Sequence, residues 1–229
     1  MLKIKKIELS IINFLNLVVY KYILSYKILH INLYNNNMVK IRRVKESDLH
    51  DIYNLYINVT TAHPSKMTQN NSEITLEYIK NDVIDKSIKY GLMLVAENEK
   101  GKVSGIFKAY TSPYRSLAHI MTNVTLMSDP KDPSHTRVFV MLLNEFFSIV
   151  KNEYKHIYKL ETAPHSSNKV AIKFYLSHGL KTDIVLKNKI FNIETGGFED
   201  EVLMSWVNPN FDMEELKKYH SYLLKCIKQ

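Results

Sequence analysis

The chain has a single cysteine, Cys226, among 229 residues. One cysteine forms no intramolecular disulfide, and it supplies no C-x-x-C pair for the usual zinc sites of cysteine and histidine. We therefore expect no structural metal. A chain without disulfides fits a reducing compartment, which favours the cytoplasm.

Long apolar runs are also missing from the sequence. The apolar stretch 9–20 falls short of the roughly 20 residues that a membrane-spanning helix needs, and Lys21 and Lys27 interrupt its continuation. No small-residue cleavage site follows it, so it does not resemble a signal peptide. The sequence predicts neither a transmembrane anchor nor a secretory leader.

The excess of positive charge is small outside the N-terminal segment. Five lysines and one glutamate give residues 1–37 a net charge of +4, which leaves +4 of the total of +8 for the rest of the chain. Such a charge suits a polyanionic cofactor as well as it suits DNA. We expect no nucleic-acid partner.

Residues 1–37 are interpreted as an N-terminal extension outside the core, because Asn35, Asn36 and Asn37 separate them from the compact pattern that starts at Met38. The alternative is an amphipathic helix within residues 1–34 that lies on a membrane or a partner, with Ile12 and Leu15 on its apolar stripe.

The remaining sequence has the pattern of one α/β (α+β) domain over residues 38–207, followed by a C-terminal helix within residues 208–229. Apolar residues make up 45% and charged residues 24%, which is ordinary for a globular protein. Alternating and helical apolar spacings predict the order β-α-α-β-β-β-α-β-α-β-β. The main expected elements are strands at 39–44, 92–97, 102–110, 117–127, 156–162, 180–193 and 201–207, and helices at 49–59, 72–83, 136–150 and 166–178.

The segment Asn168-x-x-Ala171-x-x-Phe174-Tyr175-x-x-x-Gly179-Leu180 resembles the N-x-x-A-x-x-F-Y-x-x-x-G-F pattern of the GNAT superfamily. The resemblance covers about residues 38–207. It implies a mixed, mostly antiparallel central sheet flanked by helices, and an N-acetyltransferase that moves an acetyl group from acetyl-CoA directly to a small-molecule or peptide amine.

The resemblance also implies roles for particular residues. Tyr175 corresponds to the proton donor for the departing thiolate, and Asn168 lies on the helix beside the cofactor. The central strand pairs with the pantetheine arm through its main chain, which assigns that contact to Val124, Thr125 and Leu126.

The loop before the next helix departs from the family pattern, because it contains no glycine. Glycines and a helix N-terminus would normally let backbone amides approach the pyrophosphate. In this loop the charges of Asp129 and Asp132 would repel an anion, whereas the backbone amides at the start of the following helix would attract one. The candidates for holding the pyrophosphate are Ser134, His135, Thr136 and Arg137.

The general base has two candidates, since the carboxylate often found on the central strand is absent. A protonated alkyl amine has a pKa near 10 and must lose a proton before it attacks. His119 has a suitable unperturbed pKa near 6.5, and Glu161 lies on the neighbouring strand. A chain of water molecules is a third route.

The sequence names neither the acceptor nor the oligomeric state. Tyr53, Tyr56 and His63 are candidates for lining the acceptor pocket. A rival interpretation is a GNAT-like binding module with weak or no catalysis, because the loop glycines and the strand carboxylate are both missing.

Overall fold

The computed structural model describes residues 39–193 and 195–227. They belong to one compact unit that begins at Val39. The interpretation of residues 1–37 as an extension, and the alternative of membrane contact through residues 1–34, lie outside the described residues.

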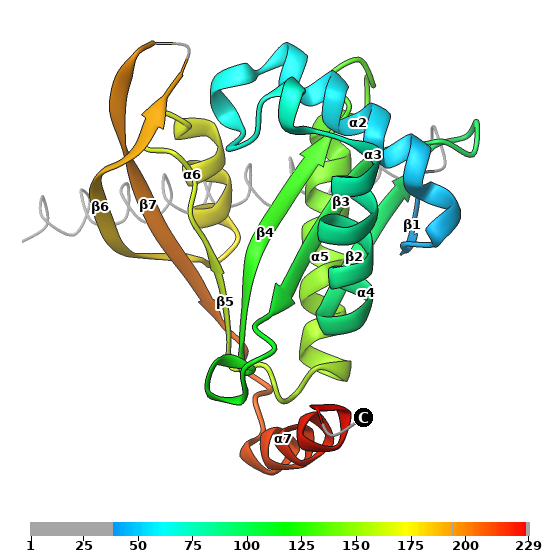
Figure 1. Cartoon of the computed structure of the whole chain (residues 1–229), viewed down its shortest axis with the longest axis vertical. Coiled ribbons are helices and arrows are strands. Elements are labelled where there is room, and N and C mark those ends of the chain that lie inside the picture. Colours follow the sequence, from blue (N-terminus) through cyan, green and yellow to red (C-terminus); the bar gives the residue numbers. More distant parts are fainter. Residues whose placement is uncertain (1–38, 194, 228–229) are drawn as a thin grey trace, which may run out of the picture. The chain divides into compact units, whose positions relative to one another are not determined.

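Seven strands within these residues form a single sheet in the order β1-β2-β3-β4-β5-β7-β6 (Figure 1). Neighbouring strands are antiparallel except β4 and β5, which are parallel. The predicted mixed, mostly antiparallel sheet is therefore confirmed. The strands are β1 (Lys40–Arg43), β2 (Gly91–Glu97), β3 (Val103–Thr111), β4 (Ile120–Ser128), β5 (Lys159–Thr162), β6 (Lys181–Asn192) and β7 (Gly197–Val207).

Helices cover both faces of the sheet (Figure 1). One face packs against α2 and a continuous run of α3, a π-helical segment and α4, and the other packs against α5 and α6. The helices are α2 (Leu49–Ala62), α3 (Leu76–Tyr78), the π-helix (Ile79–Asp85), α4 (Lys86–Tyr90), α5 (His135–Glu153), α6 (Lys169–Ser177) and α7 (Met213–Ile227). Short 3-10 turns lie at Glu46–Asp48, Pro64–Lys66, Asn71–Glu73 and Arg115–Leu117.

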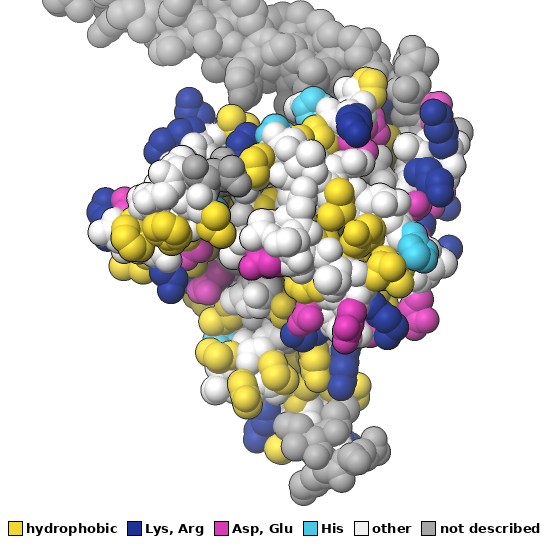
Figure 2. All heavy atoms as spheres, turned by 45° about the horizontal axis from the view of Figure 1, so that its top comes forward, with side chains coloured by type: hydrophobic (Ala, Val, Ile, Leu, Met, Phe, Trp, Pro, Cys, Tyr) yellow, Lys and Arg dark blue, Asp and Glu magenta, His cyan; other side chains and the backbone are white. Residues whose placement is uncertain are grey.

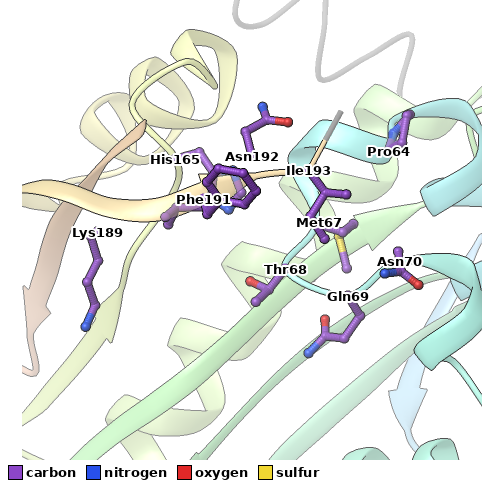
Figure 3. A pocket seen from close by; sticks show the side chains of 11 residues that line it. Pro64, Met67, Thr68, Gln69, Asn70, His165, Lys189, Phe191, Asn192 and Ile193 are labelled. Carbon is purple, nitrogen blue, oxygen red and sulfur yellow. The ribbon is translucent and has the colours of Figure 1, made fainter. Parts of the chain in front are cut away.

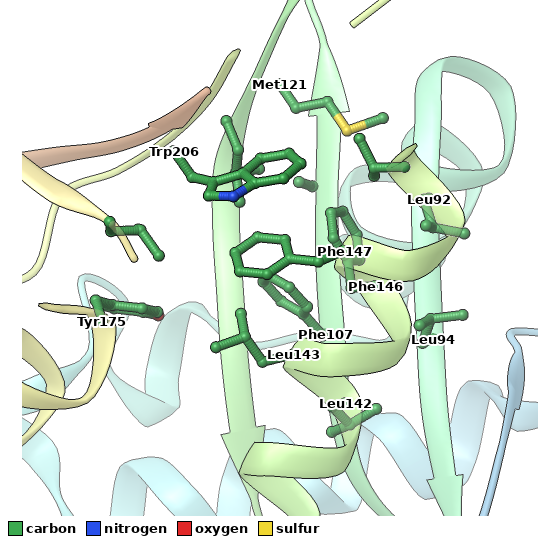
Figure 4. Close-up of a cluster of buried hydrophobic side chains, with 14 of the residues drawn as sticks. Leu92, Leu94, Phe107, Met121, Leu142, Leu143, Phe146, Phe147, Tyr175 and Trp206 are labelled. Atoms are coloured by element: carbon green, nitrogen blue, oxygen red, sulfur yellow. The ribbon is translucent and has the colours of Figure 1, made fainter. Parts of the chain in front are cut away.

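The larger of the two cores lies between α5 and the sheet (Figure 4). Val138, Leu142 and Phe146 follow one another at four-residue spacing and are fully buried, so a single stripe of α5 faces the strands. Phe146 meets Phe107 of β3 with ring centroids 4.1 Å apart. This packing fixes the position of the first turn of α5, which lies beside the candidate site.

Several elements begin at residues other than those expected, such as β4 at Ile120 rather than 117 and β5 at Lys159 rather than 156. Helix α6 starts at Lys169 rather than 166, because the side chain of Asn168 caps it by accepting a hydrogen bond from the Ala171 amide at 3.2 Å. Strand β7 starts at Gly197 rather than 201, because it pairs with β6 as a hairpin from Asn192↔Gly197 onward.

Helix α7 packs through Leu216 and Leu223, which are seven residues apart and buried. Tyr219 stacks on His156, with ring centroids 4.0 Å apart. Among the residues that the structure describes, every helix is too short or too polar to cross a membrane.

Candidate active site

The parallel strands β4 and β5 part soon after they meet. They pair only at Ile120↔Lys159 and Met121↔Leu160. Strand β4 then continues to Ser128 beside β3, while β5 continues beside β7. The two strands diverge in Figure 1, and no other strand among the described residues pairs with this edge of β4 beyond Met121.

A β-bulge lies on β4 immediately after this point. Lys108 pairs with Thr125 and Tyr110 with Thr122, so two residues of β4, Asn123 and Val124, oppose one residue of β3. Asn123 has a φ of 54°, in the left-handed region. The bulge re-aims the backbone of the segment that follows it.

The three strand residues predicted to contact the cofactor, Val124–Leu126, lie on this edge: Val124 belongs to the bulge, and Thr125 and Leu126 follow it. Val124 and Leu126 pack partly against the α5 core, and all three side chains remain partly exposed although they occupy the middle of the sheet. Backbone groups along this edge are available to another extended chain.

Tyr175 lies on α6 with its side chain directed into the core beside α5 (Figure 4). It is 7% exposed, and its hydroxyl lies near the Thr162 side chain at the end of β5, which opposes the effect of burial on the Tyr175 pKa. Burial raises the pKa of Tyr175 to about 12. The hydroxyl therefore stays protonated at neutral pH, as a proton donor requires.

The acidic residues of the glycine-free loop are held in tight turns. Asp132 accepts hydrogen bonds from the Ser134 amide at 2.8 Å and from the Ser134 hydroxyl at 2.7 Å. Asp129 accepts one from the Lys131 amide at 2.9 Å. The Asp132 carboxylate thus occupies two donors of Ser134 that were predicted to meet the pyrophosphate.

The other predicted anion contacts lie in the first turn of α5. His135 and Thr136 are exposed, and their side chains are 3.3 Å apart. Arg137 is partly buried. Asn168 lies at the start of α6, where its side-chain oxygen is engaged by the helix cap.

The two candidate bases lie at different places. His119 precedes Ile120, where β4 and β5 are still paired, and its carbonyl accepts hydrogen bonds from the amides of Tyr158 and Lys159. Thr162, which lies near the Tyr175 hydroxyl, is beyond the segment of β5 that pairs with β4. Four strand positions at about 3.3 Å each separate the level of His119 from that of Thr162, roughly 13 Å along the strands. His119 and Tyr175 are not brought together.

Glu161 follows Leu160, which is the last residue of β5 that pairs with β4. It alternates with Leu160 and Thr162, so its side chain lies on the opposite face from the α5 core. Its carboxylate is 2.9 Å from the Lys159 ammonium, which is also 2.9 Å from Asp183. Hydrogen bonding to Lys159 holds the pKa of Asp183 below its usual value.

A pocket of about 270 Å³ opens between the loop after α2 and the end of β6 (Figure 3). Two segments about 120 residues apart in sequence form it, 64–70 and 189–193, together with His165. Its polar lining consists of amide, hydroxyl, imidazole and lysine groups, with no carboxylate among the described lining residues. Tyr53, Tyr56 and His63 do not line it, although it begins at the next residue, Pro64.

The surface beside this pocket is apolar on the β6–β7 hairpin. Figure 2 shows apolar side chains gathered at the left, and Ile184, Phe191 and Phe198 of the hairpin are more than half exposed. No group of three or more histidine, cysteine or acidic side chains suited to a metal ion lies within the described residues.

No protein-family model and no curated protein sequence matches the chain. Solved structures do match. The GNAT-family acetyltransferase from Streptococcus pneumoniae aligns with a TM-score of 0.63 and 17% identity, over 74% of this chain and 99% of that one. A ribosomal-protein-alanine N-acetyltransferase from Brucella melitensis gives 0.61 and 20%, over 73% and 99%.

The spermidine N-acetyltransferase from Vibrio cholerae, solved with CoA and spermine, gives a TM-score of 0.59 and 16% identity, over 75% of this chain and 96% of that one. These identities are low, so the likeness shows the fold. The chain has the fold of the GNAT N-acetyltransferases, and the resemblance predicted from the sequence is confirmed.

Proposed function

We propose that this chain, which has the GNAT fold, transfers an acetyl group from acetyl-CoA to an amine by direct attack. The proposed domain comprises residues 38–207, with the C-terminal helix within residues 208–229 and the N-terminal extension outside it. The observation that carries the proposal is the early divergence of β4 from β5 after two paired positions.

The edge of β4 that faces away from β3 suits the cofactor because its backbone donors and acceptors pair with no other strand among the described residues beyond Met121. A pantetheine arm carries amide groups that can pair with Val124, Thr125 and Leu126 as a neighbouring strand would. The first turn of α5 follows β4 after the loop, so Ser134, His135, Thr136 and Arg137 lie where the phosphates would follow.

When bound, acetyl-CoA supplies a thioester whose carbonyl carbon accepts the amine nitrogen while its carbon–sulfur bond breaks. Tyr175 then gives its hydroxyl proton to the departing sulfur, for which its raised pKa keeps it protonated. The proton released by the amine goes to a base on the face of β5 that points away from α5.

Glu161 fits this base better than His119 does. Its carboxylate lies just past the point where the strands part, on the face away from α5, whereas His119 lies at the closed end. Lys159 compensates the charge of Glu161, and a water molecule between the carboxylate and the amine would carry the proton.

We assign the acceptor to the pocket between 64–70 and 189–193. Its amide and hydroxyl groups suit a small amine or a peptide N-terminus that presents hydrogen-bonding groups beside the reacting nitrogen. Lys189 on the lining would repel the several ammonium groups of a polyamine, so we expect a poorer fit for a polyamine.

The alternative is a GNAT-like module that binds a partner without catalysis. The hydrogen bonds from Ser134 to Asp132 favour it, since they occupy donors that a pyrophosphate would need. The two functions predict different responses to coenzyme A.

The test measures the binding of acetyl-CoA to the full chain by differential scanning fluorimetry and calorimetry. A ligand at about 100 times its dissociation constant adds roughly 2.7 kcal/mol of stability, so a clear rise in melting temperature supports the acetyltransferase. No shift up to millimolar concentrations rejects it in favour of the binding module.

The variant Asp132→Ala sharpens this test. It frees the donors of Ser134 and removes a negative charge, so we expect tighter binding of CoA. The matched control is Asp212→Ala. Asp212 accepts a hydrogen bond of 2.8 Å from the Glu214 amide at the start of α7, away from the site. The control should lose helix-cap stability without any change in the CoA dissociation constant.

A further inference from the structure

Lys108 is a buried lysine near the centre of the sheet. It lies on β3 with 4% exposure, although lysine is almost never buried unless it is paired. Within the described residues no carboxylate lies at ion-pair distance from its ammonium. Burying it therefore needs another interaction to offset the lost hydration.

The interaction is a hydrogen bond to the β4 bulge. The Lys108 ammonium donates to the carbonyl oxygen of Asn123 at 3.0 Å, and it lies 5.0 Å from the centre of the Tyr110 ring. Asn123 is the residue with the left-handed φ of 54°. An L-residue enters this region at a cost, and asparagine does so most readily among non-glycine residues.

The surroundings of Lys108 make its charge sensitive to pH. Burial lowers the pKa of Lys108 to about 8, with Lys86 lowering it further and Asp82 opposing the shift. Three tyrosines on this side of the sheet have pKa values that are raised by burial: Tyr56, Tyr78 and Tyr110. These tyrosines keep their protons while Lys108 titrates.

We propose that Lys108 is a positioning residue for cofactor binding. By holding the Asn123 carbonyl on the α2 side of the sheet, its ammonium fixes the bulge, and the bulge orients the backbone of Val124–Leu126 along the edge of β4 where pairing with β5 has ended. The inference rests on the proposed function, because it assigns that edge to acetyl-CoA. Lys108 itself touches no reacting atom.

The first experiment compares Lys108→Met with the wild type. Methionine keeps an unbranched stem and removes the donor, so the sheet stays filled while the bulge carbonyl loses its partner. We expect the dissociation constant for CoA and the KM for acetyl-CoA to rise about tenfold, equivalent to about 1.4 kcal/mol, with kcat changed less than threefold. The KM for the acceptor should not change.

The matched control is Lys86→Met. Lys86 is a neighbouring cation, but its ammonium pairs with Asp82 on the same helical run rather than with the sheet. Its loss should change the dissociation constant for CoA less than twofold. An equal rise in both variants would mean that net charge near the site is responsible, and it would overturn the proposal.

The second experiment observes the bulge itself, without any ligand. In the wild type, the backbone amide of Val124, which shares its peptide bond with the Asn123 carbonyl, should shift in NMR spectra with a midpoint near pH 8. The shift should be absent in Lys108→Met. If the NMR signal of the Val124 amide changes neither with pH nor with the substitution, the role of Lys108 is refuted.

The two experiments separate the inference from the function on which it rests. If wild-type protein fails to bind CoA, the proposed acetyltransferase is refuted, and Lys108 loses its role in cofactor binding with it. If the wild type binds CoA and folded Lys108→Met binds it equally well, only the positioning role is refuted.

Discussion

Gly105 of β3 lies where the sheet touches the first turns of α5. A Cβ atom built on Gly105 would lie 2.4 Å from Cγ1 of Val138, 3.1 Å from the carbonyl oxygen of Met127 and 3.3 Å from a methyl group of Leu142. The nearest contact is well inside van der Waals distance. Replacing Gly105 with alanine must therefore move α5 away from the sheet.

The loss of stability depends on whether the atoms next to the added Cβ can move away. Val138 is fully buried and is β-branched, so its side chain has essentially one rotamer in a helix and cannot turn aside. Overpacking a well-filled core costs about 1–3 kcal/mol. For a domain of this size, each 1 kcal/mol lowers the melting temperature by about 2–4 °C. We therefore expect Gly105→Ala to melt roughly 2–12 °C lower than the wild type.

The displacement should also reach the site, because Val138 directly follows Arg137 in the first turn of α5. Calorimetry should show weaker CoA binding by Gly105→Ala at a temperature where the variant is folded. Gly101→Ala is the control: Gly101 has a φ of 70° and no atom within 4 Å of an added Cβ. It should lose stability through backbone strain alone and keep its CoA affinity.

A double-mutant cycle can refute this reasoning. Val138→Ala removes the methyl group that an alanine at 105 would meet, so the double variant should be more stable than the sum of the two single changes predicts. Coupling between contacting residues is typically about 0.5–3 kcal/mol. Additive effects, or an unchanged melting temperature for Gly105→Ala, would show that α5 does not press on β3 as described.

Two further predictions concern charge. Burial lowers the pKa of His156 to about 4, below its value of about 6.5 in an unfolded chain, so the free energy of unfolding should fall as pH drops from about 6.5 toward 4. Denaturant titrations at pH 7, 6 and 5 should show this slope, and His156→Gln should reduce it. Arg42 binds Asp48 through two hydrogen bonds of 2.8 Å, and Asp48 is 6% exposed. Asp48→Asn should cost about 1–3 kcal/mol in the same assay, less than the loss of an isolated buried pair because Glu97 still binds Arg42; an unchanged midpoint would contradict it.

The helix α6 was predictable because several local signals agree there. Asn168 is a good N-cap, apolar residues recur at helical spacing, and Gly179 adopts the left-handed conformation that ends a helix, with a φ of 89°. Each signal acts within a few residues. The helix was expected from residue 166, three residues before its start at Lys169, where the Asn168 side chain makes the cap.

The bulge and the pocket were not predictable in the same way. The bulge depends on how β4 pairs with β3, and Asn123 by itself signals only a weak tendency toward a positive φ. Lys108 gives no sequence signal of burial, since lysine is normally exposed. The pocket joins segments 64–70 and 189–193, which meet only in the folded chain. Tertiary pairing determines all three features.

Whether the protein is an acetyltransferase or a binding module depends on one exchange in the loop before α5: the replacement of the Asp132 carboxylate by a pyrophosphate. Two donors of Ser134 bind the Asp132 carboxylate, which is itself an anion at the start of a helix. A pyrophosphate and this carboxylate satisfy the same groups, and the helix dipole favours either one. The missing glycines therefore matter less than the carboxylate that competes for these donors. If the phosphates displace Asp132, the free edge of β4 can serve catalysis; if Asp132 stays, the same fold remains a binding module.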